Sequence, residues 1–352
     1  MRRKCALALL CTCCSAAQNR GGGAWKFAVS GDSRNCGDIV MPAIAKAVQA
    51  SGARFYWHLG DFRAIFVPDE DMSPPPALGL HNKPMDVTEY RKEAWPDFIA
   101  HQLMPFGDVP VYLTIGNHET IIPMTRGAWI EQFARWLDTP ALRAQRLQDD
   151  PKDEAVHAYS HWTEGGVDFI SLDNATPDQF DAEQMKWLHG VLARDEASPD
   201  IQAIVVGMHE ALPGSVSRMH SMSEGLQGDR SGRETYEALW HAENVAHKET
   251  YVVASHSHYY MDHVFDTADW KGRVLPGWII GTAGAQRYKL PPENTPEQHA
   301  QTNIYGYVIG TVSAGGTVSF EFKKLSAEDL RAANGSGYPE ALVRWCYDEN
   351  HQ

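Results

Sequence analysis

The sequence has no long apolar run that could cross a membrane and no excess of positive charge. Beyond an N-terminal segment, no stretch approaches the roughly 18 uninterrupted apolar residues that a membrane-spanning helix requires. The 31 basic residues are outnumbered by 45 acidic ones, which gives a formal net charge of −14. We therefore expect no transmembrane segment in the mature chain and no nucleic acid binding. With 43% hydrophobic and 22% charged residues, the chain of 352 residues has the composition of a globular protein with a sizeable core.

Cysteine is also scarce outside the first residues. Residues 1–17 have the features of a signal peptide: a basic start at Arg2–Lys4, an apolar run over Cys5–Cys14 and small residues at Ser15–Ala17. This pattern predicts an exported protein, either periplasmic or secreted. A lipid anchor on a cysteine of the apolar run is the alternative, and it would hold the exported protein at a membrane.

Only Cys36 and Cys346 remain once residues 1–17 are removed, because the other four of the six cysteines lie in that segment. One of the two lies near each end of the mature chain. An oxidising compartment would allow them to form a single disulfide, whereas two buried free thiols would give the same sequence pattern. The sequence leaves both alternatives open.

Short apolar segments alternate with amphipathic ones through the first half of the chain, which indicates an α/β fold. Segments rich in Val, Ile, Phe and Tyr predict strands at Trp25–Ser30, Arg54–Leu59, Val109–Ile115, Val167–Leu172, Ile201–Val206, Thr250–Ala254, Trp278–Ile280, Tyr305–Val312 and Thr317–Phe322. Helices are predicted at Ile39–Ala50, Thr88–Gln102, Arg126–Leu137, Ala182–Arg194 and Arg233–Asn244. The closing strands have little helix between them, which predicts an antiparallel portion. We expect one domain at residues 24–325 and a C-terminal extension at 326–352.

Three long polar or Pro/Gly-rich segments interrupt this alternation, at Val67–Val87, Glu210–Gly232 and Gln286–Asn303. Loops of this length inside a compact domain are usually functional or disordered. These three could wall a site and select its substrate, or they could be surface decoration.

Side chains that bind transition metals follow five of the predicted strands. They are Asp32, Asp61, Asn117, His118, His209, His256 and His258. Carboxylate oxygen, amide oxygen and imidazole nitrogen are the donors that such metals take, and ligands collect where the strands of open α/β sheets end. In an extended His256-Ser257-His258 segment both rings would point to one side, because side chains alternate along a strand. Two imidazoles could then serve two adjacent ions.

In combination and order, these motifs resemble those of the calcineurin-like metallophosphoesterases. The resemblance runs from about Trp25 to Gly284 and is carried by two Gly-Asp pairs, Gly-Asn-His-Glu, a single histidine after a strand, and His-x-His. It implies two mixed β-sheets packed as a sandwich and flanked by helices. It also implies a centre of two divalent transition metal ions (Mn, Fe or Zn).

The resemblance assigns ligands and a mechanism by position. Metal one would be bound by Asp32, Asp61 and His258, and metal two by Asp61, Asn117, His209 and His256, with Asp61 as the bridging carboxylate. Two cations about 3.5–4 Å apart lower the pKa of a bridging water, and the hydroxide would attack phosphorus in line. His118 cannot easily serve the same ion as its neighbour Asn117, so we expect it to assist the leaving group. The expected substrate is a small phosphate ester, and monoester, diester and pyrophosphate remain open.

The sequence departs from the family pattern at two positions. Many members carry a histidine two residues after the first aspartate, where this chain has Arg34. Arginine has no lone pair for a metal ion, so metal one loses a ligand, and Arg34 would instead grip a phosphate oxygen or pair with a nearby carboxylate. Ala64 stands where purple acid phosphatases carry a tyrosine, which excludes a ferric-tyrosinate site.

Two other functions are compatible with parts of the sequence. A serine esterase of the SGNH type would use Ser33 as nucleophile, with Asp348 and His351 completing a triad. This alternative leaves the metal-type residues unexplained, and His351 is the penultimate residue. A catalytically idle metal-binding relative is the second alternative, because the loss of a ligand at Arg34 would weaken metal one.

Overall fold

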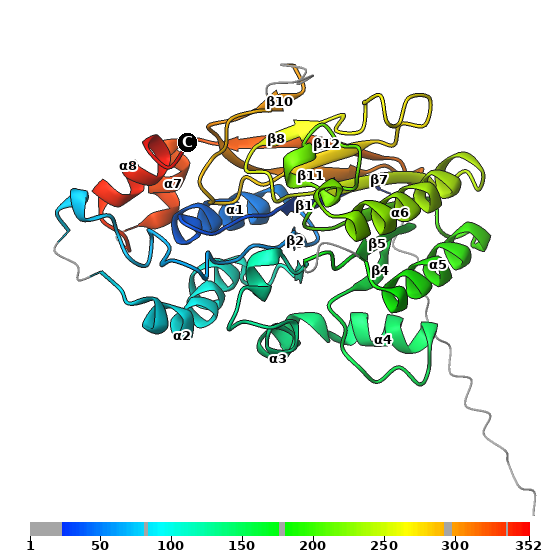
Figure 1. Ribbon diagram of the computed structural model, residues 1–352, viewed down its shortest axis with the longest axis horizontal. Coiled ribbons are helices and arrows are strands. Elements are labelled where there is room, and N and C mark those ends of the chain that lie inside the picture. The colour runs from blue at the N-terminus through cyan, green and yellow to red at the C-terminus, as the bar shows by residue number, and fades with distance from the viewer. Residues whose placement is uncertain (1–22, 81–83, 176–179, 292–297, 336) are drawn as a thin grey trace, which may run out of the picture.

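Two β-sheets form the centre of the molecule, and helices flank them (Figure 1). The computed structural model describes residues 23–80, 84–175, 180–291, 298–335 and 337–352. Both sheets are mixed, so the sandwich expected from the sequence is confirmed. The predicted signal peptide at residues 1–17 lies outside the described residues. Among the residues described, no helix is both long and apolar enough to cross a membrane.

The first sheet has five strands in the order β12-β11-β1-β2-β3. Its strands are β1 (Trp25–Ser30), β2 (Tyr56–His58), β3 (Val111–Leu113), β11 (Tyr305–Val312) and β12 (Val318–Leu325). Strands β1, β2 and β3 are parallel, whereas β11 runs antiparallel to both β1 and β12. The antiparallel closing portion predicted from the sequence is therefore present.

The second sheet has seven strands in the order β10-β8-β9-β7-β6-β5-β4. Its strands are β4 (Ser160–Glu164), β5 (Val167–Ser171), β6 (Ala203–Gly207), β7 (Glu249–Ala254), β8 (Tyr260–Asp262), β9 (Gly277–Ile280) and β10 (Ala300–Gln301). Strands β5, β6, β7 and β9 are parallel. The sequence does not predict β4, β8 or β10, because β4 is largely polar and the other two have only three and two residues.

The core between the sheets explains why the central strands are apolar along their whole length. In β6, Ala203 and Val205 join a cluster with side chains of the first sheet, whereas Ile204 and Val206 pack on the other side with the helices. Alternate side chains thus face two different apolar layers, as in a parallel strand that is covered on both faces. An aromatic contact joins the sheets directly, since the rings of Phe27 and Phe169 lie 4.9 Å apart.

Eight α-helices occur among the described residues. They are α1 (Gly37–Ser51), α2 (Val87–Phe98), α3 (Arg126–Leu137), α4 (Pro140–Asp149), α5 (Ala182–Ala197), α6 (Leu226–Asn244), α7 (Ala327–Asn334) and α8 (Glu340–Asp348). Five of them correspond to the predicted helices, although α6 begins seven residues before the predicted start. The sequence does not predict α4, in which only Leu142 is buried, or the short helices α7 and α8. Several of the eight helices have a side-chain N-cap. In α4, for example, Thr139 accepts a hydrogen bond from the Leu142 N–H.

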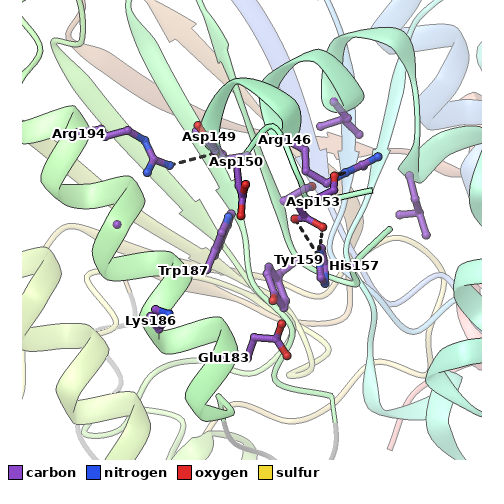
Figure 2. A pocket seen from close by; sticks show the side chains of 15 residues that line it. Arg146, Asp149, Asp150, Asp153, His157, Tyr159, Glu183, Lys186, Trp187 and Arg194 are labelled. Atoms are coloured by element: carbon purple, nitrogen blue, oxygen red, sulfur yellow. Dashed lines mark hydrogen bonds and ion pairs between the residues drawn. The ribbon is translucent and has the colours of Figure 1, made fainter. Parts of the chain in front are cut away.

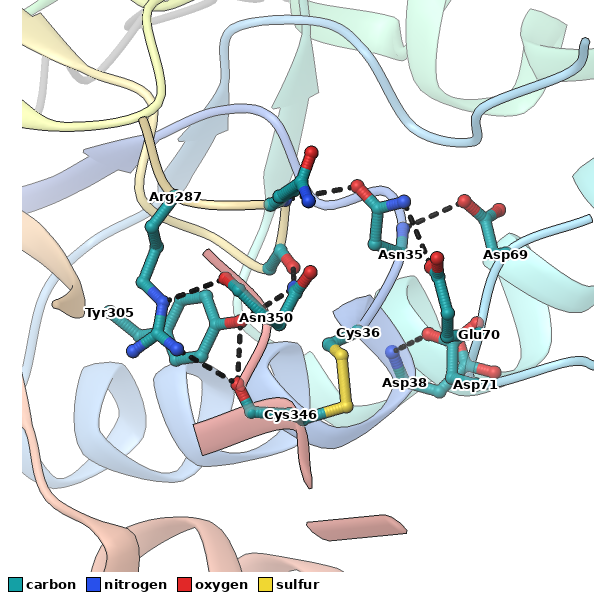
Figure 3. The surroundings of a disulfide bond; sticks show 12 residues. Asn35, Cys36, Asp38, Asp69, Glu70, Asp71, Arg287, Tyr305, Cys346 and Asn350 are labelled. Atoms are coloured by element: carbon teal, nitrogen blue, oxygen red, sulfur yellow. Dashed lines mark hydrogen bonds between the residues drawn. A yellow bond between two sulfur atoms is a disulfide. The ribbon is translucent and has the colours of Figure 1, made fainter. Parts of the chain in front are cut away.

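The C-terminal residues are bound to the first part of the chain by a disulfide between Cys36 and Cys346 (Figure 3). The Cα atoms are 5.9 Å apart, although 310 positions separate the two cysteines in sequence. Helices α7 and α8 lie beside α1 (Figure 1), and their apolar side chains, such as Leu330 and Leu342, share one buried cluster with it. Asn350 adds a hydrogen bond to the carbonyl oxygen of Gly284. Of the two alternatives that the sequence left open, the structure has the disulfide.

Candidate metal centre

The predicted metal-type residues meet where parallel strands of both sheets end. Asp32 follows β1, Asp61 follows β2, and Asn117 and His118 lie in a short turn after β3. From the second sheet, His209 follows β6, and His256 and His258 follow β7. Each sheet therefore contributes its carboxyl-terminal edge, and segments more than 200 residues apart come into contact there.

Four of these side chains bring a donor atom to one point. The Nε2 atom of His209 lies 2.9 Å from Asn117 Oδ1, 3.2 Å from Asp61 Oδ1 and 3.0 Å from His256 Nδ1. The donor atoms of Asp61, His209 and His256 all lie within 4.8 Å of one another. This is the ligand set that the sequence assigned to metal two.

Neighbouring groups fix the orientation of the His209 ring. Its Nδ1 lies 2.9 Å from the carbonyl oxygen of Leu59 and 3.1 Å from Ser255 Oγ. Because a carbonyl oxygen can only accept, Nδ1 carries the proton, and the Nε2 lone pair points at the donor cluster. Outer hydrogen bonds of this kind orient the histidine ligands of metal ions.

Asp32 and His258, which the sequence assigned to metal one, also lie together. His258 Nε2 is 3.3 Å from Asp32 Oδ1, and the other oxygen of Asp32 accepts a hydrogen bond from the His256 N–H at 2.7 Å. His258 donates its Nδ1 proton to the carbonyl oxygen of Gln286 at 2.6 Å. The Nε2 lone pair of His258 is therefore directed into the site.

Arg34 inserts its guanidinium between these residues. Its Nη2 lies 3.2 Å from His258 Nε2 and 3.3 Å from the hydroxyl oxygen of Tyr288, and its Nε lies 3.8 Å from Asp61 Oδ2. The side chain is 11% exposed. Burial works against its charge, but Asp61, Tyr288 and Asp32 together raise the pKa of Arg34 above its ordinary value.

His118 lies beside the cluster without joining it. It donates its Nδ1 proton to the carbonyl oxygen of Ala64 at 2.7 Å, and its Nε2 is 3.6 Å from Asp61 Oδ2. The ring of Phe66, a half-exposed side chain, lies 5.4 Å from the His118 ring. Burial lowers the pKa of His118, although Asp61 acts in the opposite direction.

The loops that carry the ligands approach each other closely. A Cβ atom on Gly116 would lie 2.3 Å from the backbone nitrogen of Asp61, so only glycine fits at this position. Three candidate ligands also have left-handed backbone conformations, with φ of 59° at Asp32, 59° at Asp61 and 63° at His256. Such conformations are uncommon outside glycine and cluster at functional sites, where the surrounding structure stabilises them.

The charges in the cluster shift the pKa values of its members in different directions. Burial lowers the pKa of His256 and, together with the charge of Arg34, that of His258. Their neutral rings offer lone pairs. Burial opposes the charge of His209, but Asp61 raises the pKa of His209 to about 10. A divalent cation binds only a neutral imidazole, so it would take the place of the additional proton on His209.

Two residues at the site have no motif that would reveal them in the sequence. The Tyr288 ring stacks on the His258 ring with centroids 3.9 Å apart, and His220 lies 5.4 Å from His256 and 5.3 Å from Tyr288. Tyr288 belongs to the long segment Gln286–Asn303, and His220 belongs to Glu210–Gly232. These two segments therefore contribute side chains to the walls of the site.

The prediction of a serine esterase triad is wrong, because Ser33 and His351 have other partners. Ser33 Oγ contacts His58 Nε2 at 3.0 Å, and His58 Nδ1 accepts a hydrogen bond from the Gly60 N–H. Nε2 therefore carries the proton and donates to Ser33, so His58 cannot act as the base of this serine. His351, the predicted base, is exposed and bonds the carbonyl oxygen of Gln352 instead.

A pocket of about 400 Å³ lies between α4, β4 and α5, and none of the predicted site residues lines it (Figure 2). Its walls are acidic, basic and aromatic side chains, including Tyr159 and Trp187. Arg194 pairs with Asp149 at 3.0 Å on one side of the pocket. This pocket and the candidate metal centre are therefore two separate places in the molecule, and the centre is recognised by the convergence of its donor atoms.

The whole fold can be compared with known proteins. No protein-family model and no curated protein sequence matches the chain. Among solved structures, one described as the structure of PhoD is similar with a TM-score of 0.53 and 15% sequence identity, over 86% of this chain and 72% of that one. A dimetal phosphatase from Danio rerio has a TM-score of 0.48 and 10% identity, over 86% of this chain and 99% of its own.

The two mixed sheets, packed as a sandwich with the candidate ligands at the strand ends, define a fold class, the α/β sandwiches of two packed mixed sheets. Within that fold class, the similarity to the PhoD structure points to one particular fold. The chain has the calcineurin-like metallophosphoesterase fold, as the resemblance in its sequence motifs predicts.

Proposed function

We propose that the protein is a metal-dependent hydrolase of phosphoric esters. The observation that carries this proposal is the convergence of Asp61 Oδ1, Asn117 Oδ1, His209 Nε2 and His256 Nδ1 on one point. One carboxylate, one amide and two imidazoles fit a divalent ion such as Mn²⁺, Fe²⁺ or Zn²⁺. Two buried carboxylate oxygens without a hydrogen-bond partner, Asp32 Oδ1 and Asp61 Oδ2, support the presence of a cation nearby.

A bound divalent cation supplies two things to this chemistry: it acidifies water, and it neutralises the charge of phosphoryl oxygens. The protein contributes the remaining functions through its own side chains. Leu59 and Ser255 hold the His209 ring, so that its Nε2 faces the ion. Arg34 has a buried Nε without a hydrogen-bond partner, and this donor can bind a phosphoryl oxygen.

His118 is assigned to the leaving group. Its Nδ1 is engaged by Ala64, so Nε2 is the atom that would face the substrate, on the same side as Asp61 Oδ2. A protonated Nε2 would deliver a proton to the leaving oxygen; burial lowers the pKa of His118, and the nearby carboxylate of Asp61 partly offsets this effect. The hydrogen bond to Ala64 holds the ring in place for that transfer.

Export is the second part of the proposal. Residues 1–17 would be removed as a signal peptide, leaving a catalytic domain at 24–325 and the extension at 326–352. The disulfide between Cys36 and Cys346 supports an oxidising compartment, periplasmic or extracellular. The intact mass of the protein recovered from a secreting host tests this part, because retention of residues 1–17 would contradict it.

The hydrolase is tested with purified protein loaded separately with Mn²⁺, Fe²⁺ and Zn²⁺, on an aryl phosphate monoester and a bis-aryl phosphate diester. We expect turnover of at least one ester, loss of turnover on chelation and recovery on metal addition. Asp61→Asn should reduce kcat/KM by more than the roughly 10–100-fold that loss of an outer partner of a metal ligand costs. Asp200→Asn is the matched control, since Asp200 is exposed on the surface.

A catalytically idle relative is the competing function, and Arg34 is the observation that favours it. In that case the protein would bind metal but hydrolyse neither ester under any of the three metals. The relative rates on the two esters also separate phosphatase from phosphodiesterase.

A further inference from the structure

The position expected for metal one already contains a cation of the protein. Arg34 Nη2 lies 3.2 Å from His258 Nε2, and Arg34 Nε lies 3.8 Å from Asp61 Oδ2. Asp61 and His258 are two of the three side chains that would bind metal one. The guanidinium thus contacts the same ligand atoms that an ion at this position would need.

The hydrogen bonds determine what each of these atoms can do. His258 Nδ1 lies 2.6 Å from the carbonyl oxygen of Gln286, which can only accept, so the Nδ1 proton is fixed there. The lone pair on Nε2 then accepts the hydrogen bond from Arg34. A metal ion at position one would require this same lone pair, so Arg34 and the ion compete for it.

Arg34 is also held in place from the other side. Its Nη2 bonds the hydroxyl of Tyr288, and the Tyr288 ring stacks on His258 with centroids 3.9 Å apart. The Tyr288 carbonyl in turn accepts a hydrogen bond from Thr302. These contacts keep the guanidinium, which is only 11% exposed, between His258 and Asp61.

The charge of Arg34 is a second reason why an ion would not bind at the position of metal one. A guanidinium is always protonated in proteins, and a divalent ion at the same place would meet its charge at close range in a buried site. The guanidinium can in turn supply what the missing ion would have supplied to the substrate. It places a positive charge and planar N–H donors beside Asp61 Oδ2, where phosphoryl oxygens would lie.

We propose that this centre binds a single divalent ion, at Asp61, Asn117, His209 and His256, and that the Arg34 guanidinium permanently replaces metal one. The inference rests on the proposed phosphoric ester hydrolysis, of which it specifies the metal content. It differs from the two-ion centre that the sequence motifs imply. His258 then positions Arg34 rather than binds metal, and Asp32 contacts His258 and the His256 N–H.

The number of ions is measured directly, without reference to activity. Two other groups among the described residues bring donor atoms within 4.8 Å, namely Asp38, Asp97 and His101, and Asp262, His263 and His299. The double variant His101→Ala/His299→Ala removes one donor from each and serves as the background. After loading with Mn²⁺ and dialysis, we expect one ion per chain by elemental analysis and the electron paramagnetic resonance spectrum of an isolated ion.

Variants at position 34 test whether Arg34 is the reason why only one ion binds. Arg34→His, made in that background, restores a lone pair at this position and should raise the content to two ions per chain, with a spectrum that shows exchange coupling between neighbouring Mn²⁺ ions. Arg34→Lys keeps a positive charge without a ligand and should remain at one uncoupled ion. A failure of Arg34→His to bind a second ion would overturn the role given to Arg34.

A matched pair of histidine variants provides a test that leaves Arg34 intact. His256→Ala should weaken Mn²⁺ binding by at least about 10-fold, whereas His258→Ala should change it by less than about threefold, because only His256 would bind the ion. Equal losses in the two variants would overturn the proposal. Two coupled ions in the background protein would also overturn it while leaving the hydrolase function intact, and an absence of bound metal would overturn both.

Discussion

Glu119 accepts a hydrogen bond from the backbone N–H of Asp61, with 2.9 Å between Glu119 Oε2 and the Asp61 nitrogen. The same carboxylate accepts from Gly116 at 2.7 Å and from Phe62 at 2.9 Å. It therefore joins the loop after β2 to the loop after β3. Through these three bonds a side chain that binds no metal sets the distance between the Asp61 and Asn117 backbones.

We expect Glu119→Gln to weaken Mn²⁺ binding by about 10–100-fold, the usual effect of removing an outer partner of a metal ligand. The substituted side chain has one acceptor oxygen for three N–H groups, and its own amide would face a backbone donor. Metal titration of the variant measures the effect. Glu93→Gln is the control, because Glu93 is exposed on α2; equal affinities in the two variants would contradict the role of Glu119.

Ser33→Ala should lower stability without removing turnover. The substitution leaves the buried His58 Nε2–H without its acceptor, which costs about 1–3 kcal/mol in the free energy of unfolding. Urea denaturation measures this loss, and phosphate ester turnover should stay within a few-fold of the wild type. His351→Ala is the companion variant and should change neither quantity, because the His351 side chain is exposed. Loss of turnover in both variants would instead support the serine esterase hypothesis.

Reduction of the disulfide should destabilise the protein. The bond between Cys36 and Cys346 closes a loop over a sequence separation of 310, and removal of a native disulfide costs about 2–5 kcal/mol. A reducing agent should therefore lower the melting temperature of the wild type. It should have no effect on the double variant Cys36→Ala/Cys346→Ala, which lacks the bond. A melting temperature that responds equally in both proteins would show that the reductant acts elsewhere.

His161 predicts a pH dependence of stability far from the candidate centre. The ring lies between Asp149, 2.5 Å from its Nε2, and Asp168, 2.7 Å from its Nδ1. Although burial opposes the charge, hydrogen bonds to these carboxylates raise the pKa of His161 to about 10 from its ordinary value of 6.5. The folded state thus binds a proton that the unfolded state releases above pH 6.5. The stabilisation is complete below that pH and is lost as the pH rises toward 10. Asp195, whose pKa burial and Asp168 raise to about 9, releases its own proton in the upper part of the same range.

His161→Gln measures this contribution. At pH 6 we expect the variant to be less stable than the wild type by about 3 kcal/mol, the typical cost of removing one partner of a buried pair. The difference should shrink steadily between pH 6.5 and 10 when urea denaturation is repeated across that range. His189→Gln is the control, since His189 pairs with Glu234 on the surface. A difference that does not change with pH would show that His161 is neutral in the folded protein.

The sequence by itself determined the two-sheet fold and the kinds of donor at the site. Apolar runs that end in Asp32, Asp61, Asn117 or His209 are local patterns. The carboxyl ends of parallel strands lie at the same edge of a sheet, irrespective of the loops that follow them. The same local patterns missed α4 and β4, because α4 buries only one residue and β4 is largely polar. Both elements form through packing that lies outside their own segments.

Only the tertiary structure decided which side chains contact each other. The pairs Arg34–His258, Ser33–His58 and Cys36–Cys346 join segments 224, 25 and 310 positions apart. No spacing rule predicts such contacts, because they depend on how the loops cross at the sheet edges. The hydrogen-bonding state of each ring is likewise set by neighbours such as Gln286 and Ala64, whose carbonyl oxygens hold the protons of His258 and His118. The motif pattern therefore pointed to two ions, whereas the three-dimensional contacts of Arg34 favour one.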